Sequence, residues 1–394
     1  MITGSSWSYK GDVIMNIDEQ WVRANYKGEE SFTIPNGVTS IGEWAFNDCQ
    51  SLKSITISDS VVSIGEEAFW DCKSLESINI PDRVTNIGDG VFWNCKSLKS
   101  VTIPDVVKSI GNGAFHDCES LKSIIIPDGV TSIGDMAFAR CASLESITIP
   151  ESVTSIGDWA FSYCLSLESI TIPDSITSIS NNAFCGCASI ESITIPDSIT
   201  SIGGEAFEYC ASLKSIIIPN GVTSIGHEAF YGCTSLESIT IPDSVVSIGE
   251  EAFLGCKTTI IFKEIEYPSY VFSSENTFSF IKEPSYENLM RIKEVLIKAR
   301  LALNYINSED KRFVNYTKGH CAVLIKSSAE NDDWDTLDKI LNSKHNLLRP
   351  KQLEECLEFT IKNNYHELSV LLMQYKEQRT CMYDKDDNRF DLGL

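Results

Sequence analysis

Ten cysteines at a constant spacing are the first residues in this sequence that could do chemistry. They recur every 23 residues from Cys49 to Cys256, each between an aromatic and an aliphatic position. Disulfides are one interpretation, because stacked strands about 4.8 Å apart fall within the Cα distance that a bridge tolerates. The apolar flanks favour the other interpretation, in which the thiols are reduced and serve as small buried side chains. The lone C-x-C of Cys185 and Cys187 is a weak metal signal, so no metal site is predicted there.

No other residue pattern indicates catalysis. The sequence has no H-E-x-x-H, no Walker loop, no G-x-G-x-x-G after a strand and no G-x-S-x-G elbow. The five histidines are scattered, at positions His116, His227, His320, His345 and His366. We therefore expect a protein that is not an enzyme and that takes no cofactor.

A column of acidic residues recurs with the same 23-residue period, immediately after a conserved Ile-Pro or its equivalent. Like charges at neighbouring strands repel one another, and a divalent cation such as calcium could relieve that repulsion. Asp82, Asp105 and Asp128 are the candidates for such a site. The alternative is that these carboxylates cap the N–H groups of turns. The column comprises Asp59, Asp82, Asp105, Asp128, Glu151, Asp174, Asp197 and Asp243.

Aromatic residues are concentrated at variable positions of the same period. Exposed aromatic side chains with polar neighbours are typical anchors of protein interfaces. Trp70 and Trp93 hold equivalent positions in adjacent copies, so we expect them to be neighbours on the surface. The alternative is that the rings only shield the turns beneath them. The predicted partner-binding residues are Trp44, Trp70, Trp93, Trp159, Tyr163, Tyr209 and Tyr231, with His116 and Arg140 at related positions.

The element that must position all of these residues is a tandem repeat. Ten copies of 23 residues occupy residues 40–262 without a slip of register, and Ser155–Thr177, SIGDWAFSYCLSLESITIPDSIT, is representative. One copy cannot bury its apolar face alone, so neighbouring copies must stack into a continuous core. The copies start at Ser40, Ser63, Asn86, Ser109, Ser132, Ser155, Ser178, Ser201, Ser224 and Ser247.

Within the representative copy, Ile170 and Ile172 alternate with Ser169 and Thr171, which predicts a strand with the hydroxyl side chains facing outward. Pro173 should end that strand, because proline lacks the N–H that a ladder bond needs. The outward Ser and Thr either form a binding surface for ice or glycans or simply let the sheet curve, and the second interpretation is favoured.

The remainder of the copy should turn the chain back. Gly157 suits a turn that needs a positive φ, and Asp158–Tyr163 is predicted to form one short helical turn on the opposite face.

The repeated motif IPxSVTSIGxxAFxxCxSLxSIxIP resembles the BspA-type, or Treponema-type, leucine-rich repeat. The resemblance covers about half of the chain. It implies a right-handed α/β solenoid, mostly β, of ten repeats. It also implies a non-catalytic role, since members include bacterial and protist surface proteins implicated in adhesion. The leading hypothesis is an adhesion-type interaction protein at the cell surface, and the alternative is an intracellular protein-protein interaction scaffold.

The flanking segments predict caps and a second domain. Residues 1–39 should form an N-terminal cap with strands over Tyr9–Asn16 and Trp21–Tyr26 and a half repeat from Phe32. At the other end, Thr258–Phe262 breaks the pattern, and residues 263–284 should form a C-terminal cap and linker.

From residue 285 the apolar spacing becomes helical, which predicts a small all-α domain over 285–378 and a mobile tail over 379–394. The first apolar positions are Leu289, Ile292, Val295, Leu296 and Ala299. Residues 334–341 and 365–372 correspond at an offset of 31, which resembles a degenerate ankyrin-like repeat; a plain helical bundle is the alternative.

Charge limits the class of partner. The chain has a formal net charge of -23, and residues 40–262 contain 28 Asp and Glu against 10 Lys and Arg. Nucleic acid and anionic membranes are therefore poor partners, and a protein ligand is expected for a monomeric solenoid. The sequence shows neither a secretory signal in Met1–Ser8 nor a transmembrane run, so we expect a location in the cytoplasm or export by an unconventional route.

Overall fold

The computed structural model describes residues 16–262, 265–268, 311–330, 333–343 and 347–386. By its internal contacts the chain divides into two units, Met1–Glu275 and Asn276–Leu394. Among the helices in these described ranges, none is long and apolar enough to cross a bilayer.

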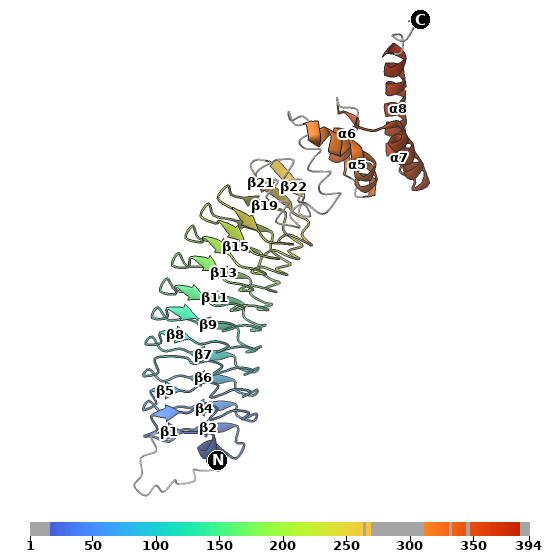
Figure 1. Cartoon of the computed structure of the whole chain (residues 1–394). Coiled ribbons are helices and arrows are strands. Elements are labelled where there is room, and N and C mark those ends of the chain that lie inside the picture. Colours follow the sequence, from blue (N-terminus) through green and yellow to red (C-terminus); the bar gives the residue numbers. More distant parts are fainter. Residues whose placement is uncertain (1–15, 263–264, 269–310, 331–332, 344–346, 387–394) are drawn as a thin grey trace, which may run out of the picture. The chain divides into compact units, whose positions relative to one another are not determined.

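The first unit is a stack of parallel β coils, each of which repeats the path of the coil before it (Figure 1). Within the sheets most strands pair in parallel with the equivalent strand 23 residues away, as Ser146 pairs with Ser169. The predicted β-solenoid is confirmed. One set of strands, mostly of three residues, comprises β2 (Ser31–Thr33), β4 (Ser54–Thr56), β6 (Ser77–Asn79), β7 (Ser100–Thr102), β9 (Ser123–Ile125), β11 (Ser146–Thr148), β13 (Ser169–Thr171), β15 (Ser192–Thr194), β17 (Ser215–Ile217) and β19 (Ser238–Ile241).

A second set of two-residue strands runs along another side of each coil. Except for Phe32 in β2, the central residue of each strand in the first set is aliphatic, and in β13 the buried Ile170 lies between exposed Ser169 and Thr171, as predicted. β13 ends two residues before Pro173. The short strands are β3 (Ser40–Ile41), β5 (Ser63–Ile64), β8 (Ser109–Ile110), β10 (Ser132–Ile133), β12 (Ser155–Ile156), β14 (Ser178–Ile179), β16 (Ser201–Ile202), β18 (Ser224–Ile225) and β20 (Ser247–Ile248).

The core of the solenoid contains a continuous column of phenylalanines. One ring from each coil stacks on the next from Phe46 to Phe253, with centroids 5.2 to 5.7 Å apart, and each ring is at most 1% exposed. Each aromatic pair adds about 0.5–1.5 kcal/mol to the burial of its rings. The column therefore couples each coil to both of its neighbours.

The periodic cysteines line the core beside these rings. They are buried free thiols, in agreement with the favoured interpretation. From Cys72 onward each thiol donates a hydrogen bond to a phenylalanine carbonyl of the preceding coil, as Cys164 Sγ does to Phe138 O at 3.2 Å. Burial raises the pKa of the Cys164 thiol well above its usual value. The thiols thus act as hydrogen-bonding links between coils.

The path of the turn differs from the prediction in two ways. Trp159 and Tyr163 adopt positive φ values of 62° and 57°, so Asp158–Tyr163 forms tight turns, and the predicted helical turn is wrong. Gly157 is absent from the positive-φ residues, so that prediction is wrong as well. Glycine is required there for close approach, because a Cβ on Gly157 would lie 2.4 Å from Asp135 N in the coil before it.

One coil departs from this rule. Ser180 occupies the place of Gly157, and its hydroxyl donates to Ile156 O. At this coil the pairing of the short strands lapses, because β12 and β14 belong to separate sheets. Thr154 and Gly157 donate their N–H groups to the preceding coil at 2.9 Å, and the equivalent bonds of Thr177 and Ser180 are missing from this described stretch. Thr85 and Gly88 lack the same two bonds among the described residues, although Gly88 has no Cβ, so the gap beside Ser180 is one of two along these coils.

The N-terminal cap also differs from the prediction. Trp21–Tyr26 is not a strand: α1 (Glu19–Asn25) forms there, because Asp18 accepts the Trp21 N–H at 2.8 Å and caps the helix. β1 (Asn16–Ile17) pairs with β3. Most of the strand predicted over Tyr9–Asn16 lies outside the described residues.

At the other end of the solenoid, β21 (Thr259–Phe262) pairs in parallel with β19, and β22 (Ile265–Pro268) pairs antiparallel with β21. The change of direction ends the parallel ladder where the repeat pattern was predicted to break. The rest of the expected cap lies outside the described residues.

The second unit is helical, as predicted. Its helices are α5 (Lys311–Glu330), α6 (Trp334–Leu341), α7 (Pro350–Lys362) and α8 (His366–Asp386), and α5 and α7 contribute Leu324, Ile325 and Cys356 to a shared core. α8 continues past the boundary predicted at residue 378. The helical spacing predicted from Leu289 to Ala299 lies outside the described residues, and the ankyrin-like relationship stays a prediction.

Candidate functional site: the turn edge of the solenoid

The candidate site is the row of tight turns along one side of the coils, residues 43–48 and the equivalent residues every 23 positions up to 250–255; we call it the turn edge. Successive turns are tied together by backbone hydrogen bonds, as between Trp159 N and Asn181 O at 2.9 Å. Side-chain ladders add to this, since Asp135 Oδ1 accepts the Asp158 N–H at 2.8 Å. The turn edge is therefore a fixed surface on which variable side chains are displayed.

The first four coils carry a continuous stack of rings on this surface. Trp44 stacks on Trp70 and Trp70 on Trp93, both with centroids 5.4 Å apart, and Trp93 stacks on His116 at 3.9 Å. We call these four residues the aromatic column. The prediction that Trp70 and Trp93 are neighbours is confirmed. All four side chains are half-buried, so their rings present edges to solvent and cover one another's faces.

His116 ends the column in a neutral form. Burial lowers its pKa, and this outweighs the opposing effect of Asp117, whose Oδ2 lies 3.1 Å from His116 Nδ1; Arg140 lowers the pKa further. An uncharged imidazole can stack on Trp93 without a cost in buried charge.

Farther along the turn edge the aromatic residues form separate groups. The Arg140 guanidinium lies 5.3 Å from the centre of the Tyr163 ring. Tyr209 and Tyr231 meet edge to face at 5.4 Å. Trp159 is 38% exposed. The structure thus places every predicted partner-binding residue on one edge but gathers only the N-terminal set into one stack.

Glycines that the sequence reasoning overlooked make room for these rings. A Cβ on Gly113 would lie 2.3 Å from Trp93, and a Cβ on Gly186 would lie 2.7 Å from the Tyr163 ring. Gly232 stands in the same relation to Tyr209. Gly186 and Gly232 each follow their tyrosine in the sequence by one repeat length. A search for aromatic residues followed by glycine 23 positions later would have found them.

The other candidate surfaces carry less support. Ser and Thr do form an exposed row on the three-residue strands, interrupted by Ile125 and Ile217, which are each 82% exposed. Asp82, Asp105 and Asp128 are exposed, and no group of three or more His, Cys, Asp or Glu in the described ranges could hold a metal ion. The structure thus gives the calcium hypothesis no support.

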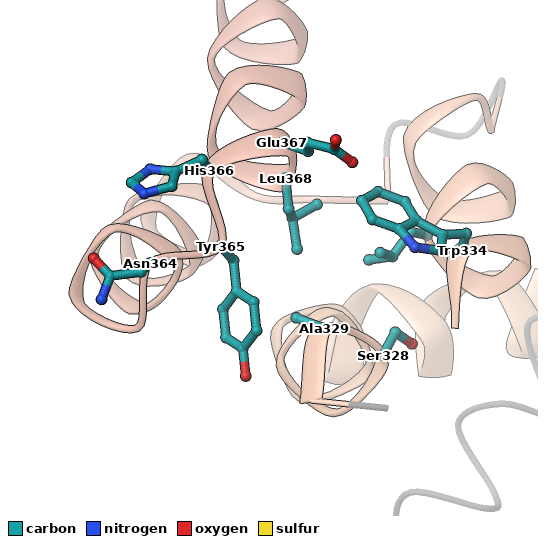
Figure 2. A pocket seen from close by; sticks show the side chains of 9 residues that line it. Ser328, Ala329, Trp334, Asn364, Tyr365, His366, Glu367 and Leu368 are labelled. Carbon is teal, nitrogen blue, oxygen red and sulfur yellow. The ribbon is translucent and has the colours of Figure 1, made fainter. Parts of the chain in front are cut away.

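A second, separate candidate is a pocket of about 340 Å³ in the helical unit. Figure 2 shows Trp334 of α6 on one side and Tyr365 on the other, with Leu368 of α8 between them. Leu337 and Ala329 complete its apolar walls. Trp334 and Leu337 correspond to Tyr365 and Leu368 at the offset of 31 noted in the sequence, so the two related segments build one pocket. Its size and walls suit an apolar side chain or small molecule.

Comparison with known proteins identifies the family. The model of the BspA type leucine rich repeat region matches residues 24–145, 108–220, 131–260 and 200–316, with six copies. These overlapping matches span well over half of the chain. The chain belongs to the BspA-type leucine-rich-repeat family. Solenoids of this family are typically non-catalytic. No curated protein sequence matches the chain.

Two solved structures of leucine-rich-repeat proteins are similar to parts of the chain. A leucine-rich repeat protein from Bacteroides ovatus is 39% identical, with a TM-score of 0.56 over 59% of this chain and 63% of that one. A leucine rich cell surface protein from Faecalibacterium prausnitzii is 30% identical, with a TM-score of 0.34 over 63% and 91% of the two chains. The chain thus spans less than two thirds of the Bacteroides protein, and the likeness to that protein supports the solenoid fold.

Proposed function

We propose that this BspA-type protein is a non-catalytic interaction protein that binds a protein partner through its turn edge, with the aromatic column as the central contact. The observation that carries this proposal is the stack from Trp44 to His116, in which four rings are held partly exposed on a rigid repeat surface. Aromatic rings on a rigid surface bury large areas at little cost in conformational entropy.

The finer proposal is a role in adhesion at the cell surface. Family membership supports it, because the BspA-type repeat is shared with surface proteins implicated in adhesion to host matrix or to other cells. An elongated row of equivalent turns also suits a large protein ligand, since successive coils can contribute to one extended contact.

A second candidate is an intracellular scaffold, and the pocket of the helical unit favours it. Trp334 is 44% exposed at the rim of this pocket, so the second unit offers an anchoring place of its own. A chain with one binding surface on each unit could hold two partners. Protease treatment of intact source cells separates the two roles, because a surface adhesin is cleaved and an intracellular scaffold is protected.

The experiment that tests the turn edge compares two double variants of the full chain. Trp70→Ser with Trp93→Ser removes the centre of the aromatic column. Ile125→Thr with Ile217→Thr removes two exposed apolar side chains from the strand face and leaves a residue that fills this row in six other coils. We expect binding to purified matrix proteins and to cells to fall at least tenfold in the first variant only.

Both variants must keep the circular dichroism spectrum of the native solenoid. If the tryptophan variant is folded and binds as the native chain does, the aromatic column is not the contact and the proposal is wrong. A loss of binding in the strand-face variant alone would move the site to the other surface.

A further inference from the structure

The turn edge carries a large excess of negative charge. Its ten segments contain fourteen carboxylates and a single Arg or Lys, Arg140. All fourteen are at least partly exposed. In the described residues only Lys73 forms an ion pair with one of them, Asp71, while the rings of His116 and His227 lie beside Asp117 and Glu228.

Three acidic side chains beside the three-residue strands are paired with lysines. There Lys99 lies 2.7 Å from Glu76, Lys122 3.3 Å from Glu145, and Lys214 2.8 Å from Glu191. These three strand-side acids are therefore each balanced by a lysine of the neighbouring coil. In the described residues no ion pair reaches the acidic column from Asp59 to Asp243 either, but the turn edge differs from that column because it also carries the stacked rings.

The turn-edge carboxylates also crowd one another around the aromatic column. Glu67 has a raised pKa, first because of burial and then because of Glu43, Glu66 and Asp89. The side chain of Glu67 lies over Gly90 of the next coil, where a Cβ would come within 2.8 Å of it. Like charges held this closely in the free protein are stabilised when a partner brings cations.

Ring edges beside carboxylates suit one kind of side chain in particular. The faces of the column rings are covered by stacking, so a cation has little access to them. The methylene stems of lysine and arginine can lie on the ring edges while their charged ends reach the carboxylates. Arg140 is an example within the molecule of a cationic side chain beside an aromatic ring of this edge, because its guanidinium lies 5.3 Å from the centre of the Tyr163 ring.

We propose that the turn edge recognises an extended Lys/Arg-rich segment of the partner protein, which lies along successive coils with its aliphatic stems on the aromatic rings and its cations on the carboxylates. This inference rests on the proposed function and specifies its partner. Ten coils at about 4.8 Å each extend for about 48 Å, which is about 14 residues of extended chain.

The test uses a labelled 14-residue peptide of alternating Lys and Ser, with a Glu-Ser peptide of the same length as its reference. Binding to the full chain is followed by fluorescence anisotropy at low and at physiological salt. The test variant combines Glu43→Gln, Glu66→Gln and Glu67→Gln. The matched control combines Glu76→Gln, Glu145→Gln and Glu191→Gln, which removes the same net charge from the strand side.

We expect the cationic peptide to bind, the anionic peptide not to bind, and the affinity to fall with salt. The turn-edge variant should bind the cationic peptide about tenfold more weakly, and the strand-side variant should change the affinity less than about twofold. Equal losses in both variants would show attraction to net charge alone and overturn the inference, as would equal binding of the two peptides.

The Trp70→Ser, Trp93→Ser variant separates this inference from the proposed function. If the tryptophan variant binds the peptide normally while the turn-edge charge variant does not, the proposal of a cationic partner is supported. The proposal that the aromatic column is the contact is then wrong. If matrix or cell binding requires both tryptophans but no cationic peptide binds, the proposed function stands and the cationic partner is wrong.

Discussion

Replacing Ser180 with glycine should leave the stability of the solenoid nearly unchanged, although a mutation to glycine usually lowers stability. Ser180 is the one residue at its repeat position with a Cβ, and the pairing of β12 with β14 lapses beside it. A glycine would let Thr177 and residue 180 donate to the preceding coil, as Thr154 and Gly157 do at 2.9 Å. Two recovered backbone bonds contribute about 2 kcal/mol. Loss of the Ser180 hydroxyl bond costs about 1 kcal/mol, and added chain flexibility in the unfolded state costs about 0.5–1 kcal/mol more. The net change in stability is therefore within about 0.5 kcal/mol of zero.

Urea unfolding of the full chain, followed by circular dichroism, measures this effect against two controls. Ser180→Ala keeps the Cβ and loses only the hydroxyl bond, so it should destabilise by about 1 kcal/mol. Gly157→Ser introduces a Cβ at the equivalent position one coil earlier and should also destabilise by about 1 kcal/mol. If Ser180→Gly lowers the urea midpoint as much as Ser180→Ala does, close approach of the coils is not what this glycine position provides.

Three further substitutions or conditions test other parts of the structure. Phe161→Ala removes a buried ring stacked on both sides and should cost about 4 kcal/mol in urea unfolding, whereas a change under about 1 kcal/mol would show that the phenylalanine column contributes little. Gly186→Ala places a Cβ against Tyr163 at a φ of 73° and should both lower the midpoint and weaken partner binding; binding unchanged in the folded variant would exclude Tyr163 from the contact. Burial raises the pKa of the thiols from Cys49 to Cys210, to about 11 at Cys49, so their contribution to stability is complete below about pH 8.5 and is lost as pH rises. The urea midpoint should fall steeply between pH 8.5 and 10, and less steeply in Cys164→Ala; a flat profile would contradict the burial of these thiols.

The regular part of the fold was predictable because every coil repeats the same apolar positions. The inward Ile170, the outward Ser169 and Thr171, and the end of the strand before Pro173 all follow from alternation and from the missing proline N–H. The neighbouring tryptophans were predictable for the same reason, since equivalent residues of adjacent coils must lie one strand spacing apart.

The turns were not predictable from local propensity. The sequence of a single copy predicts a positive φ for Gly157. The role of Gly157 depends instead on the distance to the preceding coil, and that distance is set by how the coils stack. Trp159 and Tyr163 adopt left-handed conformations that non-glycine residues seldom choose, because inter-coil hydrogen bonds hold them there. Trp21 lies in a helix and not in the predicted strand, because Asp18 caps the start of that helix.

The stack between coils likewise extends farther than the sequence indicated. Trp44 occupies a different repeat position from Trp70, and His116 carries an imidazole where Trp70 and Trp93 carry an indole. Both residues nevertheless join the column. The length of the column depends on the directions that the side chains take from left-handed turns, and residue type and period do not encode these directions.

Photo-crosslinking from two surface positions of the full chain tests the central claim most directly. A benzophenone side chain is placed at Tyr209 on the turn edge, which is 49% exposed, or at Ile125 on the strand face, which is 82% exposed. On cells that the protein binds, the account predicts a crosslinked protein from position 209 and none from position 125, despite the greater exposure of the latter. A crosslink from position 125 alone would place the partner on the strand face and contradict the account.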